Sequence, residues 1–145
     1  MKNLLILITA IALSQFAGVV QAADSLEYKL AVIDAGKYVA SSDSSIPRVR
    51  GILIGLERCY GVPQKRAADM SSRAWQMAKQ DGHPLGLIDI MDGALIACDD
   101  KSNAQALANA LSQYVAVRSA TGQTHQQVVH GLLILNYVAK VAMKK

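Results

Sequence analysis

Several patterns that would reveal a function are missing from this 145-residue chain. The two cysteines are far apart and form no C-x-x-C pair, which excludes a thioredoxin-like redox motif. There is no G-x-S-x-G sequence and no glycine-rich phosphate-binding loop, so common signatures of serine hydrolases and nucleotide-binding proteins are absent. Strand-like alternation of apolar and polar residues is not convincing anywhere. We therefore expect an all-α protein without a cofactor, and no motif indicates an enzyme.

A long apolar run of the kind that crosses a membrane is also missing. The N-terminus has one early charge, Lys2, an apolar run over 4–13, and a small-residue ending at Val20-Gln21-Ala22. This layout is typical of a cleavable signal peptide, and the run is shorter than the ~20 residues that a membrane span needs. We predict a signal peptide over 1–22 and a single domain over 23–145, located in the periplasm or, as an alternative, secreted. We expect no membrane span after cleavage.

Charge of one sign is not in large excess. Residues after Ala22 carry fourteen Lys/Arg and eleven Asp/Glu, a net charge of 14 − 11 = +3, which does not indicate nucleic-acid binding. Basic residues predominate over 46–79, whereas all five charged side chains over 81–100 are acidic. The two segments could pair across a helix interface, which is the simpler interpretation, or present two charged surfaces to a partner.

Apolar residues at helical spacing predict about six helices in a single bundle. The first three are expected to start at Asp24, Ser45 and Pro63. We expect the first to continue to Val39, the second to end before Gly61 and the third to end before Gly82.

The last three helices are expected to start at Pro84, Ser102 and Thr124. Two of these starts show the spacing of a capping box, Ser102 with Gln105 and Thr124 with Gln127. The last helix is apolar almost throughout, and we expect it to be buried.

The fourth helix is apolar on nearly every side and is therefore expected in the centre of the bundle. Gly86 and Gly93 lower its helix propensity, and the simplest reason for them is close approach by a neighbouring helix. The residues predicted to be buried across the bundle are Leu53, Leu56, Met91, Leu95 and Leu132.

Two cysteines in an exported chain favour one disulfide, Cys59–Cys98. Because Cys59 is expected to end the second helix and Cys98 the fourth, the C-terminal ends of these helices must meet.

Candidate chemistry is sparse. Asp89 and Asp92 share a helix face and could act as an acid–base pair, but pairing with basic side chains of neighbouring helices explains them more simply. The histidines, His83, His125 and His130, do not have the spacing of a metal site. We therefore predict no catalytic or metal-ligating set.

Binding residues are the better candidates. Possible contacts for a partner are basic or aromatic residues of the second and third helices: Arg58, Tyr60, Arg66, Arg73 and Trp75. The leading hypothesis is an exported, non-enzymatic protein that acts by protein–protein contact, as a binding, inhibitor or immunity-type protein, with another envelope protein as its partner. The alternatives are an envelope hydrolase that uses Asp89 and Asp92, and a periplasmic stress chaperone that opens at low pH.

The general architecture is similar to that of several short exported helical proteins with one disulfide. These include periplasmic acid-stress chaperones, secretin pilotins and immunity proteins against toxins that degrade the cell wall. None of their diagnostic motifs is present, so this likeness assigns no residue a role.

Overall fold

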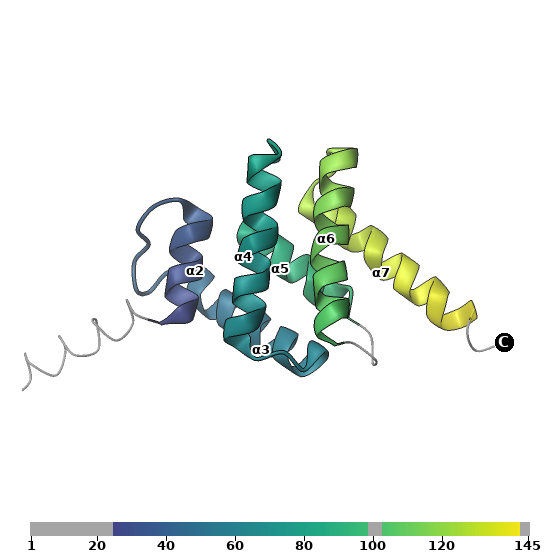
Figure 1. Cartoon of the computed structure of the whole chain (residues 1–145), viewed down its shortest axis with the longest axis horizontal. Helices are drawn as coiled ribbons and strands as arrows, with labels where there is room; N and C mark the ends of the chain where they lie inside the picture. The colour runs from purple at the N-terminus through teal and green to yellow at the C-terminus, as the bar shows by residue number, and fades with distance from the viewer. Residues whose placement is uncertain (1–24, 99–102, 143–145) are drawn as a thin grey trace, which may run out of the picture.

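The protein is all-helical, as expected. The computed structural model describes residues 25–98 and 103–142, and these ranges contain six helices and no strand. The helices are α2 (Leu26–Ala35), α3 (Ser45–Tyr60), α4 (Gln64–Gln80), α5 (Leu87–Ile96), α6 (Ala104–Thr121) and α7 (His125–Ala142). In Figure 1, α4 and α6 stand side by side, α3 crosses below them, and α7 leads away from the bundle. The predicted signal peptide over 1–22 lies outside the described residues.

Glycines set the ends of two early helices. Gly61 (φ 62°) follows α3 at the predicted position, and its N–H donates to the Glu57 carbonyl. The first helix is shorter than predicted, because Gly36 (φ 65°) turns the chain directly after Ala35. The expected continuation to Val39 is therefore wrong. The apolar pattern went on past Gly36, but a left-handed residue cannot continue an α-helix.

The N-termini of three helices have side-chain caps. Ser25 accepts the N–H of Tyr28 at α2, and Asn103 accepts the N–H of Ala106 at α6. Each cap lies one residue after the predicted one, and Asp24 and Ser102 are outside the described residues. At α7 the predicted capping box is confirmed: Gln127 Oε1 accepts the Thr124 N–H (2.8 Å), and Thr124 Oγ1 accepts the Gln127 N–H (3.3 Å).

The start of α5 depends on α2. The helix begins at Leu87 rather than at Pro84, and the Ile88 N–H donates to Asp34 Oδ1 of α2 over 2.9 Å. A local sequence pattern cannot predict a cap supplied by a helix that is distant in the sequence. Gly86 leaves room for it, since a Cβ there would lie 3.2 Å from the same oxygen.

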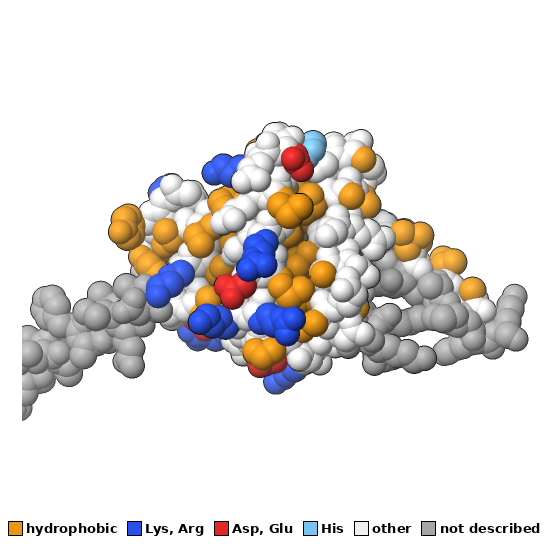
Figure 2. Space-filling model, viewed as in Figure 1, with side chains coloured by type: hydrophobic (Ala, Val, Ile, Leu, Met, Phe, Trp, Pro, Cys, Tyr) orange, Lys and Arg blue, Asp and Glu red, His pale blue; other side chains and the backbone are white. Residues whose placement is uncertain are grey.

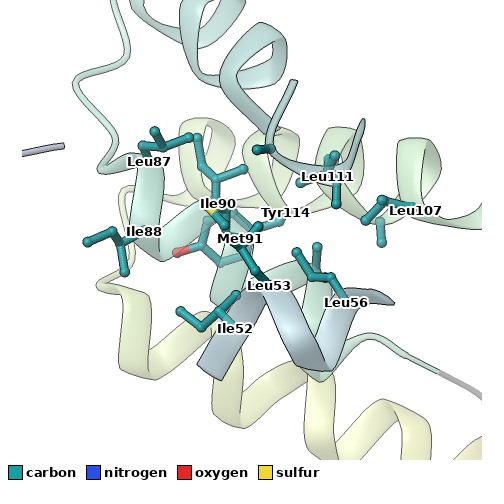
Figure 3. Close-up of a cluster of buried hydrophobic side chains, with 14 of the residues drawn as sticks. Ile52, Leu53, Leu56, Leu87, Ile88, Ile90, Met91, Leu107, Leu111 and Tyr114 are labelled. Carbon is teal, nitrogen blue, oxygen red and sulfur yellow. The ribbon is translucent and has the colours of Figure 1, made fainter. Parts of the chain in front are cut away.

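Apolar side chains of α3, α5 and α6 converge on the centre of the molecule (Figure 3). The predicted core residues Leu53, Leu56, Met91 and Leu132 are buried. Leu95 is only partly buried, because it lies over Gly55 toward the edge, where a Cβ at Gly55 would be 2.8 Å from its Cδ1. The helix α5 also contacts α2, α4 and α7, and so occupies the predicted central position.

The prediction that glycine permits close approach of a helix is confirmed at Gly93. The ring of Tyr114 on α6 packs directly on the α5 backbone there, and a Cβ at Gly93 would lie 2.1 Å from Tyr114 Cδ2. Figure 3 shows the Tyr114 ring beside Met91, in the middle of the core. No side chain larger than hydrogen fits between α5 and this ring.

The Cys59–Cys98 disulfide is present, with a Cα–Cα distance of 6.2 Å. It joins the C-terminal end of α3 to the residues that follow α5, as predicted. Close by, the Tyr60 hydroxyl donates to the Ala94 carbonyl over 2.6 Å. A covalent bond and a buried hydrogen bond thus hold the same two helix ends together.

The prediction that the last helix is buried is wrong for most of its length. Val128 and Leu132 are buried, but the helix then passes beyond α5 and α6. Large apolar side chains of its second half are 46–71% exposed: Leu133, Ile134, Leu135, Tyr137, Val138 and Val141. The apolar composition was correctly recognised, but too little of the described chain lies around this half of α7 to cover it.

The contact between Gly93 and Tyr114 can be tested by Gly93→Ala. We expect a loss of about 1–3 kcal/mol in the free energy of unfolding, because the new methyl group overlaps the ring. Gly51→Ala on α3 is the control: its Cβ meets no atom within 4 Å, so it should stabilise by up to about 1 kcal/mol. Urea denaturation measures both, and equal effects would contradict the close approach.

The disulfide can be tested by replacing Cys59 and Cys98 together with alanine. For a loop with a sequence separation of 39, the chain-entropy estimate is a loss of up to ~4 kcal/mol. The thermal midpoint should fall, while the far-ultraviolet spectrum below it stays helical. A double variant as stable as the wild type would show that the Tyr60–Ala94 contact alone is sufficient.

Candidate functional site

A polar cluster lies where α3, α5, α6 and α7 meet. Asp92 of α5 is its centre: Asp92 Oδ2 is 3.1 Å from His125 Nε2 and 3.3 Å from Arg48 Nη2. The other ring nitrogen, His125 Nδ1, lies 2.6 Å from the Tyr114 hydroxyl and 4.0 Å from Asp89 Oδ1. The histidine is the first residue of α7, so this cluster fixes the start of that helix to three others.

The order of these contacts sets the protonation of a neutral His125. An ionised Asp92 can only accept, so Nε2 carries the proton and donates, and Nδ1 accepts from the Tyr114 hydroxyl. Burial of the phenol, and next the negative charge of Asp89, raise the pKa of Tyr114 to about 12. The hydroxyl therefore stays protonated and remains a donor throughout the ordinary pH range.

A tyrosine, a histidine and an aspartate in this order superficially suggest a nucleophile, a base and an orienting group. However, Tyr114 is only 1% exposed, so a substrate has no access to its hydroxyl. The arrangement is a buried hydrogen-bonded connection between helices, and we assign it a structural role.

Asp89 and Asp92 do share a face, with side chains that are 32% and 27% exposed. Asp92 is already occupied by Arg48 and His125, which is the ion-pair arrangement that the sequence favoured over acid–base chemistry. The described residues contain no group of three or more His, Cys, Asp or Glu side chains placed to hold a metal ion.

The five residues predicted as partner contacts do not form a single surface. Arg58, Arg66 and Arg73 are exposed, and the latter two, seven residues apart, share the outer face of α4. Tyr60 is 3% exposed, and its inclusion was wrong, because its ring fills the core and its hydroxyl binds the Ala94 carbonyl. Figure 2 shows Lys and Arg side chains scattered among hydrophobic ones over the α3–α4 region, without a continuous basic patch.

Trp75 lies elsewhere again. It follows Arg66 by nine residues, which is about two and a half helical turns, so it is directed to the opposite side of α4. It is partly buried, and Lys79 Nζ lies 5.0 Å from the centre of its ring. Together with Asp34 of α2 and the 84–86 loop it lines an open cleft of about 580 Å³.

The most conspicuous surface feature was missed from sequence. It is the apolar second half of α7, along which hydrophobic side chains continue at the right of Figure 2. An apolar helix indicates that its surface becomes covered, but the sequence pattern does not distinguish cover by the same chain from cover by another molecule. The exposed positions become visible only once the neighbouring helices are placed.

Comparison with protein-family models found no match to this chain, and comparisons with curated proteins and with solved structures also found none. Within 25–98 and 103–142, no helix has both the length and the apolar character needed to cross a membrane. The site is therefore interpreted from its own geometry.

The raised pKa of Tyr114 predicts a loss of stability at alkaline pH. The unfolded phenol releases its proton near pH 10, whereas the folded one holds it to about 12. The contribution is thus present below pH ~10 and disappears as the pH rises toward ~12. Over this interval the free energy of unfolding should fall by up to about 2–3 kcal/mol more than in Tyr114→Phe.

This comparison is made by urea denaturation at several pH values. The Tyr114→Phe variant keeps the ring against Gly93 and lacks only the titrating hydroxyl, so it corrects for the other groups that ionise at high pH. Parallel pH profiles of the two proteins would contradict the assignment.

Proposed function

We propose that this chain is an exported, non-enzymatic protein that acts by protein–protein contact, and that α7 is its contact surface. The exposure of six large apolar side chains on the second half of α7 carries the proposal. Together they leave on the order of 600 Å² of apolar surface in water, at the upper end of the ~300–600 Å² of the largest patch on an ordinary monomer. The largest apolar patch of a protein is often a functional surface, and we assign this one to contact with a partner.

The position of α7 also favours this function. Its start is held by the His125 contacts to Asp92 and Tyr114, and Val128 and Leu132 are packed in the core. The second half of α7 thus continues a helix whose first half is held in place by these contacts. Such a helix presents its side chains in a defined arrangement, so little conformational freedom is lost on binding.

A binding, inhibitor or immunity-type role in the periplasm is consistent with this surface and with the predicted signal peptide over 1–22. The hydrolase alternative has no support from the geometry of Asp92, which is engaged on both sides. A stress chaperone is the second candidate, because an exposed apolar helix would also hold unfolded clients. It would bind many clients weakly, whereas the proposed function requires one defined partner.

The proposal predicts a specific cross-link from α7 in cells. A photoreactive phenylalanine analogue replaces Tyr137, which is 71% exposed on α7, or as the matched control Tyr38, which is 89% exposed after α2. We expect one discrete adduct from position 137 and none from position 38. The adduct should decrease at least tenfold when Ile134 and Val138 are changed to glutamate, and should persist in Met77→Glu on α4.

Each outcome has a clear meaning. A ladder of unrelated adducts from position 137 would favour the chaperone. Equal adducts from positions 137 and 38, or an adduct that survives the Ile134→Glu/Val138→Glu change, would contradict α7 as the contact surface. The same cells show whether the protein is in the periplasmic fraction without residues 1–22, as the proposal requires.

A further inference from the structure

A cleft between α2 and α4 has the size of a small-molecule site. The helix α2 packs against α3 and α5, and α4 packs against α3, α5 and α6, but α2 and α4 have no extensive contact with each other. The cleft of about 580 Å³ that contains Trp75 lies between them (Figure 1), and the 84–86 loop completes it. This volume falls within the ~300–1,000 Å³ of typical ligand pockets.

The α2 wall of the cleft is fixed by hydrogen bonds to other parts of the chain. Asp34 Oδ1 in the last turn of α2 accepts the Ile88 N–H of α5 over 2.9 Å. The Tyr28 hydroxyl donates to the Val39 carbonyl over 3.1 Å, which holds the loop that follows α2. The cleft is therefore formed before a ligand arrives, so binding requires little reordering of the protein.

Apolar side chains supply most of the walls. Six apolar residues line the cleft: Val32, Ile33, Ala35, Trp75, Pro84 and Leu85. A second hollow of about 410 Å³ adjoins it, because Val32 and Ile33 also line that hollow, together with Tyr28, Lys29 and Tyr38. The apolar surface thus continues along α2 beyond the cleft. An elongated apolar group matches this shape better than a compact one.

The charges in the cleft favour a negative group. Among the described residues that line it, Asp34 and Lys79 are the charged ones. Asp34 lies at the start of α5, where the positive end of the helix dipole offsets its charge. Lys79 Nζ lies 5.0 Å from the centre of the Trp75 ring, and no described carboxylate forms an ion pair with it. The ammonium of Lys79 is therefore available to an anion.

Neutral donors lie on the same helix. The indole N–H of Trp75 is not buried and donates to no group of the described chain. The Ser72 hydroxyl and the Gln76 amide line the cleft as well. An organic cation is disfavoured, because Lys79 already lies over the indole ring and repels it. A phosphate is best matched by arginine, and no arginine is among the described lining residues, so the chemistry favours a carboxylate.

We propose that this cleft binds a small amphipathic carboxylate with an acyl chain. The carboxylate pairs with Lys79 beside the Trp75 ring, and the chain lies along Val32, Ile33 and Leu85. The inference goes beyond the proposed function and does not depend on it, because the cleft is formed by α2 and α4, whereas the proposed contact surface is α7.

The fluorescence of Trp75 reports binding directly, since it is the only tryptophan of the chain. Octanoate added to the purified protein should shift the emission to shorter wavelength, with saturation and a half-point below about 1 mM. Hexanoate should bind more weakly, by up to a factor of about four for each methylene removed. Octanol has the chain without the charge, and its half-point should be about three- to fivefold higher than that of octanoate.

Two variants, each with a control, test the two parts of the site. Lys79→Gln should raise the half-point for octanoate about three- to fivefold and leave that for octanol unchanged, whereas Lys65→Gln, exposed on α4 outside the cleft, should change neither. Ile33→Glu places a like charge on the apolar wall and should raise the octanoate half-point at least tenfold. Met77→Glu, exposed on α4 outside this cleft, should not. Thermal midpoints show that each variant is folded.

Each alternative outcome overturns a stated part of the inference. No saturable shift up to about 1 mM octanoate would overturn the cleft as an acyl site, and tighter binding of octyltrimethylammonium would overturn the preference for an anion. Equal half-points for octanoate in wild type and Lys79→Gln would overturn the role of Lys79. Loss of the shift in Ile134→Glu/Val138→Glu would place octanoate on α7 instead. The cross-link from position 137 should persist in Lys79→Gln, so this inference and the proposed function fail separately.

Discussion

The close contact between α5 and α6 at Gly93 is the constraint on which the rest of the structure depends. Because the Tyr114 ring lies on the α5 backbone, the central helix α5 packs closely against α6. The same ring directs its hydroxyl to His125, so one side chain serves both the apolar core and the polar cluster. Core packing and the placement of α7 are therefore coupled through Tyr114.

The polar cluster and the disulfide act at different positions of α5. Near its start, Asp34 of α2 accepts the Ile88 N–H; in its second turn, Asp92 holds Arg48 of α3 and His125 of α7. Beyond its end, Cys98 is joined to Cys59. Each interaction joins α5 to a different part of the chain, and this explains how a ten-residue helix can be the centre of the bundle.

The surface contrasts with this interior. The basic residues of α3 and α4 are dispersed, and Trp75 is directed into a separate cleft with Lys79. Among the described residues, six of the nine exposed large apolar side chains lie on the second half of α7. The start of α7 is fixed by the contacts of His125, whereas no neighbour within the described chain buries its second half. This difference suits α7 to contact with a partner.

Much of the architecture could be predicted from sequence. Apolar periodicity identified the helices, Gly61 identified the end of α3, and the Thr124 and Gln127 pair identified the start of α7. The presence of two cysteines, in a chain predicted to be exported, indicated the disulfide. The helices and their ends depend on local sequence, and two cysteines allow only one intramolecular pairing. Both can therefore be predicted from a single sequence. The continuation of α2 was overestimated because the apolar pattern was given more weight than the backbone preference of Gly36.

What only the tertiary structure decided was the environment of individual side chains. Tyr60 and Trp75 have similar chemistry in the sequence, yet one is in the core and the other in a surface cleft, because burial depends on which helices come together. Asp34 as a cap of α5, and His125 as the link between Asp92 and Tyr114, join residues more than ten positions apart. For the same reason the apolar sequence of α7 determined that it must be covered, but only the arrangement of the other helices decided that the described chain does not cover it.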